Sequence, residues 1–479
     1  MKRCFCIWIL AFLAIGARAQ GPVTYRLRYA APGDCCIHLQ MVFSEPLTTP
    51  IALVMPRTYP GGYEQVPYDS FVENVRASSE AGKDVGVKRD TDGPRWTIGN
   101  RGESVERVEY QIDAARMESQ ILSSVQASKV RGGYVGLLGY SVFAYVDGLE
   151  ERRIKLVVNA PAGWPVLTTL APVIPATATT AVAEAPDYYT LADSEILLGP
   201  DLQLRRLDGK IPLILAVYSE GNEDVDMEGQ LARKALDRVQ SYFNDTPFHQ
   251  YTVQLELLRR VAGHQYDFSQ EHVDSGTFSF SVDRATTTLS SAQHRDSAVF
   301  NYAHHMAHSW IPKRAYGTGY RPFTWELAPA IDTIWFNEGF GRYAAIMALA
   351  NGMPAAEAAV FRESQVARLH KVVDEAPLFI QKMPLEVLSR EASFLYAVDF
   401  RTGKNVFARG ALMAAEMDER IREKTNGKKN LREALQALLA WCHKNNRAFQ
   451  LEEMMKIFTD ATSVDVRDIL NHWQEPPAK

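Results

Sequence analysis

The chain has 479 residues, of which 46% are hydrophobic and 23% charged, so it can build more than one hydrophobic core. Its formal net charge is −5, and it has no basic stripe, which argues against nucleic acid as a partner. Five cysteines in a chain of this length do not make a disulfide scaffold. We therefore expect a globular protein of two or three domains.

The N-terminus has the pattern of a secretory signal peptide. Lys2 and Arg3 precede an apolar run from Ile7 to Ala17, and Ala17-Arg18-Ala19 is a small-x-small cleavage site. We expect residues 1–19 to be removed after Ala19 and the protein to be secreted or periplasmic. No later segment has the length that a transmembrane helix requires.

The mature chain would keep 49 basic and 57 acidic residues, a net charge of −8. It would also keep Cys35, Cys36 and Cys442, so at least one thiol stays unpaired within a monomer. The sequence indicates neither the pairing of these cysteines nor an oligomeric state.

The first half of the mature chain reads as β structure. Apolar residues alternate with mostly polar ones over 37–43, 108–112 and 154–158, between Gly and Pro clusters. Residues 172–186, rich in Ala, Thr and Pro, predict a loop or an irregular crossing. We expect a β-sandwich-like N-terminal domain over residues 20–220.

The hydrophobic period changes after Asp226. Ala232, Leu236 and Val239 mark an amphipathic helix, and residues 253–257 return to strand alternation. An α+β domain over residues 221–420 is the expectation. Beyond it, Asn430 and Glu433 predict a capping box, and the apolar stripe that follows predicts a helical region over 421–479.

The segment His304-His305-Met306-Ala307-His308 has the spacing of two metal ligands on a helix. If residues 299–311 are helical, His304 and His308 stand one turn apart on one face. Catalytic zinc takes three protein ligands and a water, so a carboxylate from a second helix would complete the set. Glu338 is the natural candidate for this third ligand. A chance pair of histidines in a helix is the alternative, because HxxxH alone is a weak signal.

The motif lacks its catalytic carboxylate. In His-Glu-x-x-His the glutamate takes a proton from the metal-bound water, and here that position is His305. Imidazole can also accept a proton, but a rigid ring need not place its nitrogen where a carboxylate oxygen would lie.

A longer match names a family. Residues 304–310, Lys313-Arg314 and the segment 335–340 resemble the glycyl aminopeptidase family of zinc metallopeptidases, whose pattern is HExxHxWxxKR followed by WxxEGF. Residues 188–194 with Gly199, and residues 407–412, resemble two further family segments. The resemblance implies a thermolysin-like catalytic domain behind a β-rich domain, a zinc ion on His304, His308 and Glu338, and removal of N-terminal residues from peptides.

Two residues depart from the family at positions of catalytic importance. One is His305. The other is Phe407, which stands where the family's tyrosine donates a hydrogen bond to the tetrahedral oxyanion, and phenylalanine has no hydroxyl. Together the two losses lower turnover by roughly 10⁴- to 10⁷-fold if they act independently.

A third segment concerns the substrate. Residues 268–272 resemble the family's Gly-Gly-Leu-Glu-His segment, which implies that Glu271 meets the α-amine of a peptide. A carboxylate there selects free N-termini by charge-assisted hydrogen bonding. The alternative is a solvated Glu-His pair on a loop.

The leading hypothesis is a secreted metallopeptidase-family protein that keeps its zinc triad, has weak or no peptidase activity and binds peptide or protein N-termini. One alternative is an active aminopeptidase that uses His305 as its base, and another is a metal-free interaction protein. Arg342, one turn after Glu338, would repel a dication unless its side chain points away.

Overall fold

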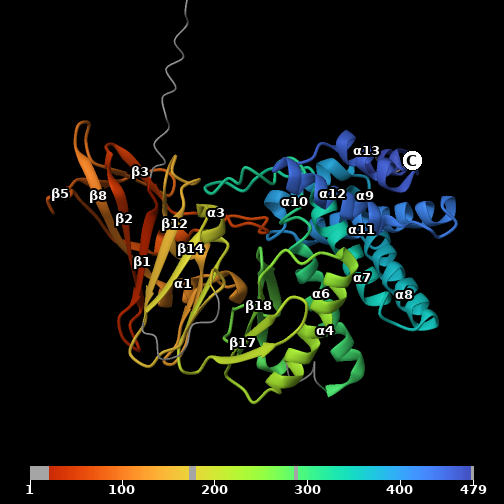
Figure 1. Cartoon of the computed structure of the whole chain (residues 1–479), viewed down its shortest axis with the longest axis horizontal. Helices are drawn as coiled ribbons and strands as arrows, with labels where there is room; N and C mark the ends of the chain where they lie inside the picture. Colours follow the sequence, from red (N-terminus) through yellow and green to blue (C-terminus); the bar gives the residue numbers. More distant parts are fainter. Residues whose placement is uncertain (1–20, 172–179, 285–289, 476–479) are drawn as a thin grey trace, which may run out of the picture.

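The computed structural model of the chain describes residues 21–171, 180–284 and 290–475. The predicted signal peptide and its cleavage site lie outside these ranges. Figure 1 shows a sheet-rich N-terminal part, a mixed unit of strands and helices, and a helical C-terminal part. The predicted α+β multidomain fold class is therefore confirmed. None of the helices in the described ranges is long and apolar enough to cross a membrane.

The N-terminal part contains three sheets. The strands of each sheet follow in spatial order: first β14 (Thr180–Ala185), β12 (Ile154–Asn159), β1 (Val23–Tyr29), β2 (Cys36–Thr48), β8 (Ser104–Asp113), β4 (Val72–Ser78) and β5 (Asp84–Val85); second β13 (Val166–Thr168), β15 (Glu195–Leu198), β10 (Val135–Leu138) and β9 (Lys129–Val130); third β11 (Tyr145–Val146), β3 (Ile51–Val54), β7 (Arg95–Ile98) and β6 (Val87–Arg89). The predicted strands at 37–43, 108–112 and 154–158 lie in β2, β8 and β12, and the apolar residues on their core-facing side, such as Leu39, Val108 and Leu156, are buried.

Five short helices connect these strands. They are η1 (Tyr68–Phe71), α1 (Ala114–Gln120), η2 (Ser124–Gln126), α2 (Gly139–Val142) and α3 (Tyr188–Ala192).

The Ala- and Thr-rich segment differs from the prediction. Residues 172–179 lie outside the described ranges, but residues 180–185 form β14, an edge strand that pairs with β12. Its alanines point inward at every second position while Thr180, Val182 and Glu184 are exposed. The loop prediction was wrong there because small alanine side chains fit this period-2 pattern as well as larger apolar residues do.

The central unit is built on a five-stranded sheet. Its order is β16 (Gln203–Leu207), β17 (Leu213–Ser219), β18 (Tyr251–Leu258), β20 (Ser275–Ser281) and β19 (Phe268–Glu271). Every residue of β18 is buried, because apolar side chains of the N-terminal part also pack against this sheet. The limits of the domains remain a prediction, although β16 and β17, which lie ahead of the expected division at residue 220, already belong to this sheet: β16 pairs with β17, and β17 pairs with β18.

Helices cover this sheet and continue to the C-terminus. They are α4 (Val225–Phe243), α6 (Ala292–His308), the π-helical turn η3 (Trp335–Phe340), α7 (Gly341–Ala350), α8 (Ala355–Asp374), α9 (Leu378–Gln381), α10 (Leu385–Leu395), α11 (Phe400–Lys424), α12 (Leu431–Asn445), α13 (Leu451–Thr462) and α14 (Arg467–Gln474). The capping box of Asn430 and Glu433 is present at the start of α12, as predicted. The metal-motif helix α6 ends at His308, short of the predicted residue 311, and Pro312 has no N–H with which to continue it.

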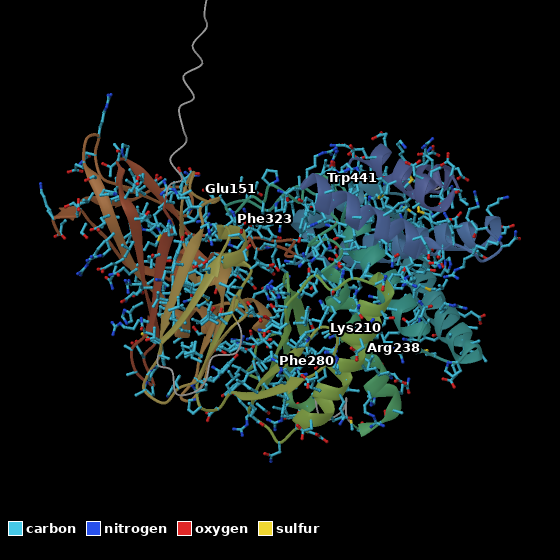
Figure 2. All side chains as sticks on the ribbon, viewed as in Figure 1. Glu151, Lys210, Arg238, Phe280, Phe323 and Trp441 are labelled. Atoms are coloured by element: carbon cyan, nitrogen blue, oxygen red, sulfur yellow. The ribbon has the colours of Figure 1, made fainter. Side chains whose placement is uncertain are left out.

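A loop of the N-terminal part and a loop of the central unit contact each other. The backbone N–H groups of Arg57 and Thr58 donate to the carbonyl oxygen of Trp325, whose ring is buried in the N-terminal core. Phe323, which is labelled in Figure 2, lies on the same loop. Its ring centroid is 6.1 Å from that of Tyr189 in the N-terminal part. This contact holds the loop around Tyr63 against the central unit.

Two glycines allow η3 to lie directly on α11. A Cβ added at Gly410 would clash with the backbone carbonyl of Trp335, and one added at Gly339 would clash with the backbone of Gly410. The close approach sets the distance between Glu338 on η3 and Phe407, which lies one turn before Gly410. Glycine is required here for space rather than for backbone conformation.

We predict that Gly410→Ala destabilises the protein by about 1–3 kcal/mol, because α11 must move away from η3. Thermal unfolding followed by circular dichroism measures the effect. Gly132→Ala is the matched control, since an added Cβ meets no atom within 4 Å there. Equal melting temperatures for the two variants would contradict the packing argument.

Candidate metal centre and its surroundings

His304, His308 and Glu338 come together as the sequence predicted. Their ligand atoms all lie within 4.8 Å of one another, and the three side chains are buried. Oε2 of Glu338 is 3.3 Å from Nε2 of His308 and 3.9 Å from Nε2 of His304. Two ligands at zinc-like bond lengths of about 2.1 Å would be about 3.4 Å apart in a tetrahedral site. The arrangement can therefore hold a metal ion.

Neighbouring groups orient two of these ligands. Nδ1 of His308 donates to the carbonyl oxygen of Ile311 at 2.9 Å, which leaves Nε2 free to act as a ligand. The hydroxyl of Tyr63 donates to Oε1 of Glu338 at 2.9 Å, so Oε2 remains for the histidines. Tyr63 belongs to the N-terminal part, 275 residues away along the chain. The N-terminal part thus contributes directly to the centre.

The charges around the centre suit a cation. Burial lowers the pKa of His304 well below its usual value, and His308, His305 and Arg342 lower it further, so this imidazole is neutral. Its Nδ1 is buried and has no hydrogen-bond partner among the described residues. For His308, burial acts against protonation, but Glu338 and Glu271 raise its pKa to about 9. A metal ion would replace that proton between His308 and Glu338.

The guanidinium group of Arg342 packs against an aromatic ring near the candidate metal centre. Its guanidinium lies over the ring of Phe300, with Cζ 5.3 Å from the ring centroid. Burial lowers the pKa of Arg342, whereas Glu338 raises it. The cation predicted to disturb the site is thus held against an aromatic ring on α6.

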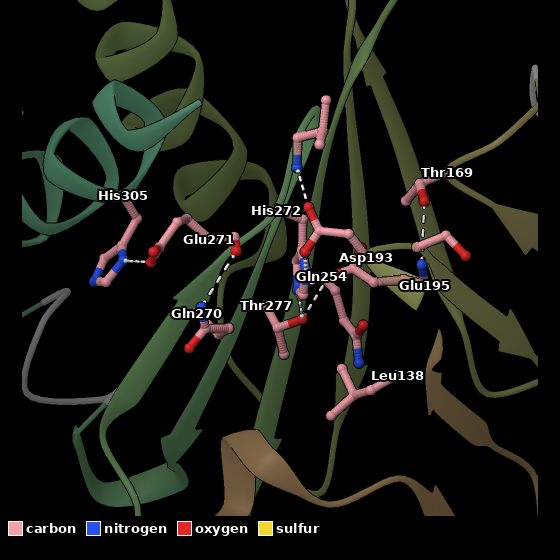
Figure 3. Close-up of polar contacts among 12 residues, drawn as sticks. Leu138, Thr169, Asp193, Glu195, Gln254, Gln270, Glu271, His272, Thr277 and His305 are labelled. Atoms are coloured by element: carbon pink, nitrogen blue, oxygen red, sulfur yellow. Dashed lines mark hydrogen bonds and ion pairs between the residues drawn. The ribbon is translucent and has the colours of Figure 1, made fainter. Parts of the chain in front are cut away.

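His305 turns toward Glu271, as Figure 3 shows. Nδ1 of His305 is 3.5 Å from Oε2 of Glu271, and the edge of its ring meets Phe278 at a centroid distance of 5.7 Å. Burial tends to raise the pKa of Glu271, but His308, His305 and Lys313 outweigh it and bring the pKa to about 2. The residue in the catalytic-base position and the expected amine-binding carboxylate therefore form one pair.

Glu271 lies at the edge of the sheet, at the end of β19, rather than on a solvated loop. It is 4% exposed, and its Oε1 has no hydrogen-bond partner among the described residues. Gly61 leaves room for it, because a Cβ on Gly61 would collide with the Glu271 carboxylate. A buried carboxylate oxygen without a donor can accept a hydrogen bond from a ligand.

Phe407 is covered by an aromatic neighbour that no sequence motif indicates. Its ring stacks on Tyr396 with centroids 5.7 Å apart, and Tyr396 also meets Tyr63 edge-on at 5.9 Å. Burial raises the pKa of Tyr396, and Glu338 and Glu271 raise it further. A tyrosine hydroxyl is therefore present in the electrostatic neighbourhood of the metal ligands, although not at residue 407.

A buried polar network joins three of the family-like segments. Nζ of Lys313 donates to both carboxylate oxygens of Asp193, at 3.0 and 3.1 Å, and to the carbonyl oxygen of Pro60 at 3.0 Å. Nδ1 of His272 is 3.2 Å from Oδ1 of Asp193, and its Nε2 is 3.2 Å from Oε1 of Glu195 (Figure 3). The network ties β19 and the Tyr63 loop to the end of the metal helix.

The comparisons with known proteins concern a domain and the fold. Residues 24–200 match the Peptidase M61 N-terminal domain. That match covers the sheet-rich part of the chain. No curated protein sequence matches the chain.

Solved structures share the whole fold. An aminopeptidase N family protein from Idiomarina loihiensis superimposes with a TM-score of 0.80 at 18% identity, covering 95% of this chain and 76% of the other. A mutant M1 zinc metallopeptidase from Deinococcus radiodurans, bound to a Tyr-Ser-Ala substrate, gives 0.55 at 14% identity, covering 96% and 94%. Yeast LTA4 hydrolase gives 0.57 at 12% identity, covering 96% and 68%. The chain is metallopeptidase-like in its N-terminal domain and in its overall fold.

Sequence reasoning placed the metal ligands and Glu271 together but missed Tyr63 and Tyr396. Neither residue belongs to a spacing pattern with Glu338, since they come from a loop and a helix end that only the fold brings to the centre. The turn Pro60-Gly61-Gly62-Tyr63 was the one local signal, because paired glycines can mark a close backbone approach.

We predict that Tyr63→Phe weakens zinc binding by about 10- to 100-fold, because the second oxygen of Glu338 loses its donor. Competition with a chromogenic chelator measures the dissociation constant directly. Tyr25→Phe removes a buried hydroxyl that donates to the carbonyl oxygen of Ala144 and serves as the control. Unchanged zinc affinity in Tyr63→Phe would show that Glu338 needs no such support.

A second prediction concerns pH. Burial disfavours the charged form of His272, but Glu195 and Asp193 raise its pKa to about 9. Its stabilising contribution is fully present below pH of about 6.5, the unfolded pKa, and is lost as the pH rises through about 9. The loss amounts to about 3 kcal/mol.

Urea unfolding of the wild type and of His272→Gln at several pH values tests this expectation. The difference in unfolding free energy between the two proteins should shrink from pH 6.5 to pH 9. The exposed His249 provides the control variant His249→Gln, which should not alter the pH profile. A difference that stays constant with pH would mean that His272 is neutral in the folded protein.

Proposed function

We propose that the protein is an exported zinc-binding relative of the metallopeptidases that has weak or no peptidase activity and binds the N-termini of peptides. The pairing of His305 with Glu271 carries this proposal. In that pair, the side chain at the catalytic-base position holds the carboxylate that would meet a substrate amine. One interaction therefore engages two groups that hydrolysis needs separately.

Zinc is the metal that the donor set fits best. Two imidazole nitrogens and one carboxylate oxygen are borderline to hard donors, and a set of three protein ligands is typical of catalytic zinc. Bound zinc would supply a Lewis acid and an acidified water. His304, His308 and Glu338 would hold it, and Tyr63 would keep the carboxylate in place.

The groups around the metal support binding more than turnover. A base at residue 305 would need to face the metal-bound water, whereas Nδ1 of His305 faces Glu271. At Phe407 the ring packs against Tyr396 and offers no donor to an oxyanion. Loss of the base and of the oxyanion donor removes transition-state stabilisation while the ligand site can remain.

The proposed ligand follows from Glu271. Its buried Oε1 lacks a donor among the described residues, and its low pKa keeps the carboxylate charged. A peptide α-ammonium group supplies both a donor and a positive charge. The similar Deinococcus radiodurans metallopeptidase was solved with a tripeptide substrate, which agrees with a peptide as the ligand class.

An active aminopeptidase is the second candidate. Contact with Glu271 would hold the His305 imidazole in one orientation, as a carboxylate does for the histidine of a catalytic triad. Tyr396 would offer a hydroxyl near the centre. A metal-free interaction protein is a third candidate, in which the ion pair of His308 and Glu338 replaces the metal.

The double variant His305→Glu with Phe407→Tyr tests the proposal. We predict that it raises turnover of glycyl and alanyl chromogenic substrates by about 10²-fold or more, because it restores a base and an oxyanion donor. The control is His305→Gln with Phe407→Tyr, which restores the hydroxyl without a base.

Zinc content is measured on each protein by mass spectrometry. A wild type that turns over these substrates at about 1 s⁻¹ or faster would establish the active candidate. A purified wild type that takes up no zinc would establish the metal-free one. A zinc-loaded, folded double variant without any gain would show that residues 305 and 407 do not limit activity.

A further inference from the structure

A cavity of about 710 Å³ lies beside the segment that follows the metal helix. It opens between the end of α4, this segment and α12, and residues such as Asn244, Arg314 and Gln436 line it. None of His304, His308 and Glu338 takes part in its lining. It is therefore a separate space from the metal centre.

Two guanidinium groups in the cavity wall have no anionic partner. Among the described residues, neither Arg314 nor Arg321 has a carboxylate within 4.0 Å, although Arg321 interacts with the side chain of Tyr189. The Nε atoms of both are buried without an acceptor. Lys313, the residue before Arg314, is instead paired with Asp193. Both arginines are half-buried, and a partly buried charge becomes more favourable when a ligand supplies a partner of opposite charge.

Aromatic rings hold both guanidinium groups in place. Cζ of Arg314 is 4.6 Å from the centroid of Phe248. Cζ of Arg321 is 3.7 Å from the centroid of Tyr189 and 5.5 Å from that of Tyr316. Stacking on the ring faces leaves the edges of the guanidinium groups, which carry the N–H donors, available to a ligand. The two cations are thus positioned in advance.

The remaining lining does not neutralise these charges. Asp245 is the carboxylate of the wall, and its Oδ2 already accepts a hydrogen bond from Nε1 of Trp310 at 3.1 Å. Burial lowers the pKa of Arg314, Asp245 and Asp274 act in the opposite direction, and the nearby Arg321 again lowers it. The cavity therefore carries an excess of positive charge in a protein whose net charge is negative.

We propose that this cavity binds a small organic anion through Arg314 and Arg321, which hold its carboxylate or phosphate group. The guanidinium fork matches the geometry of both oxyanions, and a volume of this size accommodates a small molecule rather than a single inorganic ion. Phe243 and Leu439 provide apolar surface for the rest of the ligand. Asn244 and Gln436 offer further polar groups.

Titration calorimetry with citrate and with inorganic phosphate tests the site in the full-length protein. We expect saturable binding of citrate with a stoichiometry of one and weaker binding of phosphate. Arg314→Gln and Arg321→Gln should each weaken citrate binding by about 10- to 100-fold, since each removes a charge-assisted hydrogen bond. Arg420→Gln, which alters an exposed arginine paired with Asp468, should leave it unchanged.

A second measurement avoids substitutions. Phenylglyoxal, which modifies arginine side chains, should label Arg314 and Arg321 in the wild type, and citrate should protect both from labelling. Absence of saturable binding of both anions, binding that is unaltered in the two glutamine variants, or labelling that citrate does not change would each overturn the proposal.

Discussion

The buried ion pair of Lys313 and Asp193 is the interaction on which the geometry of the centre depends. Both residues are 3% exposed, and the ammonium group also bonds the carbonyl oxygen of Pro60. Breaking such a pair typically costs about 3–5 kcal/mol, because one charge is left buried. Since Lys313 follows the metal helix and Asp193 lies just before β15 of the N-terminal part, the pair fixes the two parts against each other.

The ion pair of Lys313 and Asp193 also positions residues at the candidate metal centre, through two short segments. Pro60 begins the turn that carries Tyr63 to Glu338, and Asp193 holds His272, the residue after Glu271. The carboxylate expected to meet a ligand and the hydroxyl that orients a metal ligand are thus positioned by one buried network. A change in the network would move both, although neither contacts Lys313 directly through a hydrogen bond.

The two positions that depart from the active family are accommodated without disturbing this scaffold. His305 finds a partner in Glu271, and Phe407 stacks on Tyr396. The ligand triad beside them remains compact. The candidate metal ligands and the two substituted positions are different side chains, so a change at residue 305 or 407 can leave the ligand set intact.

Much of the fold and of the candidate centre was predictable from local patterns. The spacing of His304 and His308 on one helical face, the strands at 37–43 and 108–112, and the capping box at Asn430 all follow from periodicities of a few residues. Glu338 followed from its distance along the chain in a known motif. Such features depend on residues that are close together in the sequence, so the sequence alone is enough to predict them.

Other features required the folded chain. The strand at residues 180–185 is stabilised by pairing with β12, which a run of alanines and threonines does not reveal. Tyr63 approaches Glu338 across 275 residues, and His305 turns toward Glu271 because β19 lies beside α6. The direction of a side chain among long-range partners depends on packing and burial, so only the tertiary structure decides which of the predicted residues interact.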